Sequence, residues 1–95
     1  MYPKTGTMTA SAGTASVTIP VTDGICRLLR IAPATATTTF DVRITDRFSL
    51  NILDDENATG LYNQFVDLPC YGNFTLTVRN ASVNEAFTYL VVIQE

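Results

Sequence analysis

The chain contains no histidine and no tryptophan, and only six of its 95 residues are basic. Histidine is the commonest general base and a frequent metal ligand, so its absence removes the usual nucleophile–base pairs and structural zinc sets. A nucleic-acid-binding protein needs a basic patch, which a net charge of −3 with scattered basic residues does not supply. We therefore expect no enzymatic activity, no catalytic residues, no cofactor, no metal and no nucleic-acid partner.

Long apolar segments are also missing. No run approaches the ~18 residues of a membrane-spanning helix, and residues 1–16 lack the apolar core of a secretion signal. We expect no membrane contact and a protein that stays in the compartment where it is made. In such a compartment Cys26 and Cys70 are expected to be reduced thiols that pack as small apolar residues. A disulfide stays open as an alternative, because both residues fall on or beside expected strands.

Two polar sequence patterns could indicate a functional site, and each also has a simpler explanation. The run Asp54-Asp55-Glu56-Asn57 offers oxygen ligands for Ca²⁺, but it lacks the spacing and the fixed glycine of a helix–loop–helix calcium site, so a solvated turn is favoured. Glycosylation acceptor patterns occur at Asn57, Asn73 and Asn80. Without a secretion signal we expect these asparagines to be unmodified.

What the chain does contain is threonine, at fifteen positions that mostly lie within or beside apolar runs. Threonine is branched at Cβ and suits the pleated, half-buried surface of a strand. The usual helix formers are scarce, with one Lys, three Glu and two Gln. The composition predicts an all-β protein.

Seven segments are expected to form strands: apolar and polar residues alternate in 17–21, 40–45, 48–52 and 74–79, as they do in strands with one buried face, and residues 61–66 are expected to be a weaker strand. The full set of segments is residues 17–21, 25–32, 40–45, 48–52, 61–66, 74–79 and 85–94. Turns every 8–12 residues are typical of an antiparallel β-sandwich or small jelly roll. We expect one such domain of about seven strands over residues 15–95, with a polar turn region over residues 53–60.

Several local signals refine this prediction. Pro20 cannot donate a hydrogen bond to a neighbouring strand, so the first of these strands belongs at a sheet edge. Asp23-Gly24 predicts a hairpin, and the segments 74–79 and 85–94 predict a closing hairpin. In the segment 25–32 the expected buried face is Ile25, Leu29 and Ile31, and Arg27 interrupts it.

Residues 1–14 are small and polar and have no periodicity, so we expect an extended, flexible arm outside the sandwich. Such an arm can add a strand to a sheet edge of a partner, with Tyr2, Pro3 and Met8 as anchors. The alternative is an ordinary disordered terminus.

The last strand is apolar on both faces. Phe87, Tyr89, Val91 and Ile93 share one face, and Leu90 and Val92 lie on the other. A sandwich strand is normally polar on its outer face, so Leu90 and Val92 need cover. Either another part of the same chain covers them, or they belong to an interface with a sister subunit or partner.

In its overall style the chain resembles the small virion accessory proteins of tailed phages, in particular capsid decoration or cement proteins. The resemblance rests on the arm rich in Thr, Ala and Ser, on the phrase Thr39-Phe-Asp-Val-Arg-Ile-Thr, and on Gly72-Asn-Phe-Thr-Leu-Thr-Val-Arg-Asn. It implies a structural protein of the virion, assembled in the host cytoplasm. It also implies a homo-oligomer, often a trimer, that binds the major capsid protein or another virion protein and stabilises the outside of the head.

A second reading is a glycan- or cell-surface-binding β-sandwich from a phage tail or an adhesin. Sugar sites usually display exposed aromatic side chains, and this chain has no Trp and four Tyr. That shortage favours the structural role.

Overall fold

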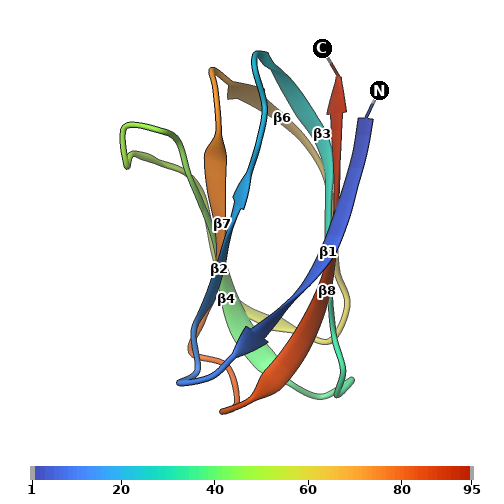
Figure 1. Ribbon diagram of the computed structural model, residues 1–95. Coiled ribbons are helices and arrows are strands. Elements are labelled where there is room, and N and C mark those ends of the chain that lie inside the picture. The colour runs from blue at the N-terminus through green and yellow to red at the C-terminus, as the bar shows by residue number, and fades with distance from the viewer. Residues whose placement is uncertain (1, 95) are drawn as a thin grey trace.

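A computed structural model describes residues 2–94 of the chain, and this part folds into eight β-strands (Figure 1). The strands are β1 (Tyr2–Ala10), β2 (Ala15–Ile19), β3 (Gly24–Pro33), β4 (Thr39–Thr45), β5 (Asn51–Thr59), β6 (Tyr62–Cys70), β7 (Phe74–Arg79) and β8 (Glu85–Gln94). The described part has no helix long and apolar enough to cross a membrane. The predicted all-β class is confirmed.

The strands form two four-stranded antiparallel sheets that face each other. Sheet A has the order β1-β8-β3-β6, and sheet B has the order β2-β7-β4-β5. Six of the seven connections pass from one sheet to the other, and only β4 and β5 are consecutive strands that pair directly. Eight strands wound in this way make a jelly roll. The predicted sandwich or small jelly roll is therefore confirmed, with one strand more than expected.

The two predicted hairpins are wrong. The turn at Asp23-Gly24 leads from β2 in sheet B to β3 in sheet A, and residues 80–84 lead from β7 in sheet B to β8 in sheet A. Turn residues specify that the chain reverses, but a reversal is equally compatible with crossing to the opposite sheet. The prediction that the strand beside Pro20 lies at an edge is confirmed, because β2 pairs only with β7.

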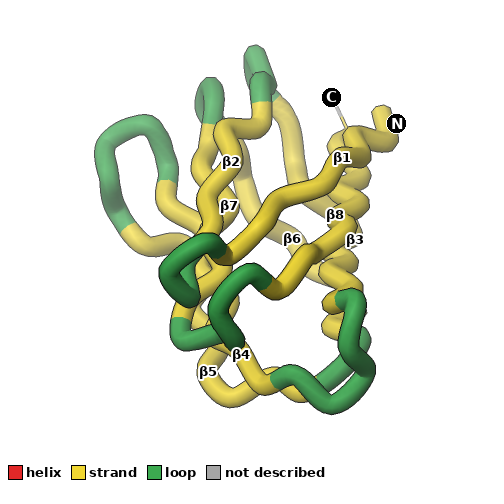
Figure 2. Tube along the Cα trace, turned by 60° about the horizontal axis from the view of Figure 1, so that its bottom comes forward, coloured by secondary structure: helices red, strands yellow, loops and turns green. Residues whose placement is uncertain are grey.

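The expected arm outside the sandwich is also not what the structure shows. Residues 2–10 form strand β1, which pairs with β8 along its whole length, from Tyr2 opposite Ile93 to Ala10 opposite Glu85. The side chains of Met8 and Ala10 are buried in the core. Main-chain pairing with β8 holds this segment in place. Its small, polar side chains gave no sign of a strand in the sequence. The β1–β2 and β7–β8 connections lie side by side (Figure 2), and Ala81 N–H donates to Gly13 O at 3.0 Å.

The strand and turn predicted around residues 48–60 are displaced. Residues 46–50 form a loop, and β5 runs through the acidic stretch that was expected to be a turn. β5 is the edge strand of sheet B, so its polar side chains stay in water. β6 continues to Cys70 through Pro69, which is tolerated because β6 is the edge strand of sheet A.

The core fills the space between the sheets with alternate side chains from both. The largest fully buried side chains are Phe40, Phe74, Phe87, Ile19, Leu29, Ile31, Ile44, Leu76, Ile93, Val42, Val78 and Val91. The rings of Phe40 in β4 and Phe87 in β8 meet edge to face with centroids 5.1 Å apart, which joins sheet B to sheet A. Each such side chain contributes about 1.5–3 kcal/mol by leaving water.

Candidate functional site

The outer face of sheet A carries a row of apolar residues that crosses all four strands. Val92 in β8 lies opposite Pro3 in β1 on one side and Leu28 in β3 on the other. Leu28 in turn lies opposite Phe65 in β6. Pro3, Val92, Leu28 and Phe65 are therefore neighbours across the sheet, and we call them the apolar row. Among residues 2–94, no other element covers this face (Figure 1).

A β-bulge in β3 places Leu28 in this row. Cys26 pairs with Ile93, and Leu28 pairs with Val92, so β3 advances two residues while β8 advances one. Because Cys26 and Leu29 are both fully buried, Arg27 and Leu28 both lie on the outer side. The predicted inward face of this strand was wrong by one residue at its start, where Cys26 rather than Ile25 is buried. A bulge of this kind re-aims side chains without ending the strand.

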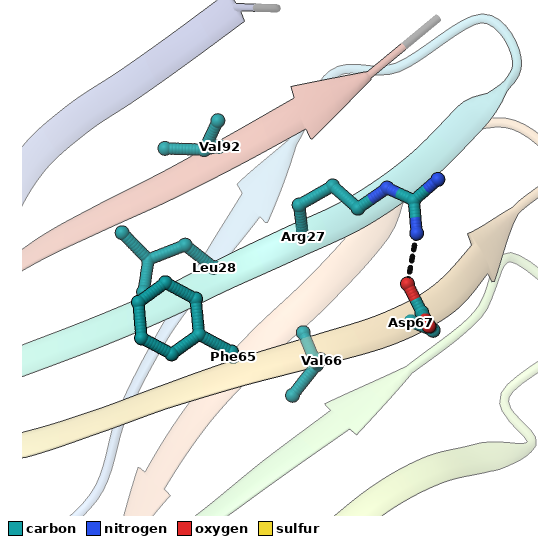
Figure 3. A pocket seen from close by; sticks show the side chains of 6 residues that line it. All are labelled: Arg27, Leu28, Phe65, Val66, Asp67 and Val92. Carbon is teal, nitrogen blue, oxygen red and sulfur yellow. Dashed lines mark hydrogen bonds and ion pairs between the residues drawn. The ribbon is translucent and has the colours of Figure 1, made fainter.

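Phe65 is the most exposed large apolar side chain in the described part of the chain, with 85% of its surface in water. Its ring lies beside Leu28 on the outer face, as Figure 3 shows. Around them is a shallow depression of about 540 Å³, lined by Arg27, Leu28, Phe65, Val66, Asp67 and Val92. Burial of Phe65 would remove a large apolar surface from water.

Polar groups border the apolar row on both sides. On one side Arg27 donates from Nε to Gln94 Oε1 at 2.7 Å and forms an ion pair through Nη1 with Asp67 (Figure 3). On the other side Arg30 Nε donates to Asn63 Oδ1 at 3.2 Å. An apolar centre with a polar rim is the usual anatomy of a protein–protein interface. The exposed Arg27–Asp67 pair itself adds at most about 1 kcal/mol to folding.

The residues predicted for an interface separate in the structure. Pro3, Leu90 and Val92 share the outer face of sheet A; Pro3 is exposed, and Leu90 and Val92 are half-buried beside their strand neighbours. Met8 is a core residue and does not belong to the face, because its side chain points toward sheet B. The side chain of Tyr2 lies outside the described part of the structure.

Sequence reasoning missed Leu28 and Phe65, which complete the row. The break in alternation at Arg27 was the available signal, since a bulge turns two consecutive residues to one side. For Phe65 no such signal exists in the sequence. Within β6 it follows two other exposed residues, Asn63 and Gln64, and only the sheet order shows that its face is the uncovered one.

The two cysteine thiols of the sandwich are held in an unreactive state. Burial raises the pKa of the Cys26 thiol to about 12, and the nearby Cys70 adds to this rise. Burial likewise raises the pKa of Cys70. Both thiols are free, buried and protonated at neutral pH, which makes them weak nucleophiles.

The acidic run is not a turn and shows no ligand cluster. Asp54 pairs with Arg43 at 3.2 Å, and Asp55 accepts a hydrogen bond from the Tyr62 hydroxyl. Within residues 2–94 no three His, Cys, Asp or Glu side chains gather as they would around a metal ion. These carboxylates instead join β5 to its neighbours.

Comparison with known proteins finds no matching family model and no matching curated protein. Among solved structures, the chain is similar to a carbohydrate-binding module, CBM36, in complex with calcium and xylotriose. The identity is 13%, the TM-score is 0.45, and the match covers 99% of this chain and 89% of that one. It is also similar to a family two carbohydrate esterase from Cellvibrio japonicus, at 13% identity and a TM-score of 0.37. That match covers 99% of this chain and 35% of the esterase, so this chain spans about a third of its length. At these scores neither likeness carries an argument about this chain.

Proposed function

We propose that this chain is a non-catalytic structural protein of a virus particle, of the capsid decoration type. Its outer face of sheet A attaches it to the major capsid protein or another protein of the shell. The observation that carries the proposal is the apolar row, which crosses four strands and ends in the exposed ring of Phe65. Exposure of such an apolar row to water is unfavourable, and contact with a partner surface removes the row from water.

The edges of the sheets support attachment through a face. Pro3 and Lys4 lie on β1, and Asp67 and Pro69 lie on β6, the two edge strands of sheet A. Proline lacks an N–H donor, and a charged side chain resists desolvation, so neither edge readily accepts a further strand. The partner is therefore expected to lie across the sheet and not beside it.

Two parts of this face serve two kinds of contact in the proposal. Phe65 and Leu28 meet the shell, and Leu90 and Val92 meet sister copies in a homotrimer. The two contacts can be tested separately, because Phe65 lies on the edge strand β6 and Leu90 lies on β8, between β1 and β3.

Attachment is tested in two steps: the genes beside this chain are searched for a major capsid protein, whose absence would contradict the proposal, and empty shells are then assembled from that protein. We expect the purified protein to sediment with the shells, and Phe65→Ser to weaken binding by about tenfold or more, since about 1.5–3 kcal/mol of apolar burial is lost. Phe65 is largely exposed, so the variant should melt at the wild-type temperature. Phe48→Ser is the matched control, because Phe48 is 66% exposed but lies in the β4–β5 loop. Failure of the wild-type protein to sediment with the shells contradicts the proposal.

A further inference from the structure

A second group of exposed aromatic side chains lies away from the apolar row. It occupies the end of the sandwich that carries the β2–β3, β4–β5 and β6–β7 connections, at the top of Figure 1. Phe48 in the β4–β5 loop is 66% exposed, and Tyr71 in the β6–β7 turn is 67% exposed. Together with Asp46, Ile52 and Pro69 they line a cleft of about 200 Å³.

The loop that carries Phe48 is held by one carboxylate. Asp46 Oδ1 accepts hydrogen bonds from the N–H groups of Phe48 at 2.8 Å and Leu50 at 3.0 Å. The main chain closes the same turn, because Asp46 N–H donates to Leu50 O at 3.0 Å. Oδ1 is thus occupied, whereas Oδ2 accepts no hydrogen bond from the described residues, and Asp46 is one of the residues that line the cleft.

Arg47 joins the two sides of the cleft. Its guanidinium lies over the Phe48 ring, 4.8 Å from the centroid, which is a cation–π contact. Its side chain also lies against Gly72, where an added Cβ would come within 3.1 Å of Arg47 Cδ. Gly72 has a φ of +101°, a conformation that favours glycine. Arg47 thus contacts both the Phe48 ring and Gly72, the residue that follows Tyr71 in the β6–β7 turn.

We propose that this cleft binds one neutral pyranose unit of a glycan. The apolar C–H face of the sugar stacks on Tyr71 and Phe48, and a ring hydroxyl donates to Asp46 Oδ2. The volume is below the roughly 300–1,000 Å³ of pockets for larger ligands, so a single ring fits. A free carboxylate oxygen beside aromatic rings suits a ligand with many hydroxyl donors and disfavours an anionic one. This site goes beyond the proposed attachment to a shell and does not rest on it.

The site is tested by titrating the isotope-labelled full chain with a panel of neutral oligosaccharides built from glucose, galactose, mannose and xylose, followed by amide NMR shifts. For at least one sugar we expect saturable shifts confined to residues 46–52 and 69–72, with a Kd in the millimolar range. Tyr71→Ala should weaken binding roughly three- to tenfold through lost stacking. Asp46→Asn keeps the Oδ1 acceptor of the loop but removes the free carboxylate oxygen, and should weaken binding without disordering the loop amides.

Phe65→Ser is the matched control and should bind sugar as the wild type does. Conversely, Tyr71→Ala should sediment with shells as the wild type does, so the two proposals fail independently. No saturable shift up to about 50 mM of any sugar in the panel overturns the inference. Shifts that cluster on sheet A, or saturable binding of a proline-rich peptide in place of the sugars, overturn it as well.

Discussion

Asp41 is a buried carboxylate that joins three parts of sheet B. It lies on β4, and its Oδ1 accepts a hydrogen bond from Asn57 N–H in β5 at 3.0 Å. Its Oδ2 accepts one from Asn80 Nδ2, after β7, at 2.6 Å. Both asparagines have positive φ, at 60° and 55°, and the carboxylate binds the main chain of Asn57 and the side chain of Asn80. The hydrogen bond from Asn57, followed by that from Asn80, lowers the pKa of Asp41.

This lowered pKa makes a prediction about acid stability. The ionised carboxylate is favoured in the folded state, so its contribution is complete above the unfolded pKa of about 3.9 and is lost as the pH falls through the lower folded value. Asp41→Asn should lower the free energy of unfolding at pH 7 by about 1–3 kcal/mol, because an amide cannot accept both hydrogen bonds equally well. It should also flatten the loss of stability below about pH 4.

Urea unfolding at neutral and acidic pH measures both effects. Asp23→Asn, at an exposed position in the β2–β3 turn, is the control and should change neither. Equal destabilisation by the two variants would show that Asp41 contributes only a surface charge.

Strand β1 forms although its own sequence has little preference for a strand. Its apolar content is low, yet all nine residues pair with β8, and its contacts with β8 are as extensive as those between β8 and β3. β8 carries four core residues, Phe87, Tyr89, Val91 and Ile93, so an unpaired flank would expose the most apolar strand of the sheet. β1 closes that flank and adds Met8 and Ala10 to the core.

Removal of residues 1–10 should therefore destabilise the whole domain, whereas a loose arm could be removed at little cost. We expect the truncated chain to lose its cooperative thermal transition or to melt far below the full chain, as seen by circular dichroism. Met8→Ala is the milder variant and should cost about 2–5 kcal/mol through the cavity it leaves. Near-normal melting of the truncated chain would show that β1 is dispensable.

At the scale of the whole molecule, every sheet edge carries a feature that resists further pairing. The edge strands of sheet A contain Pro3 and Pro69. In sheet B, β2 is only five residues long and β5 contains Asp54, Asp55 and Glu56. Proteins use short strands, prolines and charges in this way to prevent edge-to-edge association. Assembly through the outer face of sheet A is compatible with such edges.

Assembly of the whole molecule into a homotrimer stays a prediction. Leu90 and Val92 are half-buried on the outer face, while the adjacent Tyr89, Val91 and Ile93 fill the core. Replacement of Leu90 and Val92 by Ser should shift the protein toward monomer and leave the core intact. Light scattering measures the change, with Thr88→Ser on the same strand as control. A wild-type monomer at high concentration would contradict the prediction.

The sequence by itself determined the class of the fold and most of the core. Alternation in Phe74, Leu76 and Val78 and again in Phe87, Tyr89 and Val91 depends only on the two-residue period of a strand, and all six are buried. Leu90 and Val92 were named because they are apolar where the alternation predicts polar residues, whereas Pro3 was named only as an anchor of an expected arm that is in fact strand β1.

Only the tertiary structure decided which strands are neighbours and hence what the face contains. Each strand has the same alternation, so the pattern holds no information about its partner. The pairing of Leu28 with Phe65 joins β3 to β6, and that of Leu28 with Val92 joins β3 to β8; the second spans more than half of the chain. These pairings follow from closing both sheets over one core, which is a property of the whole chain and not of any segment. The cleft between Phe48 and Tyr71 depends on the same closure, because two loops far apart in sequence meet only at the end of the finished sandwich.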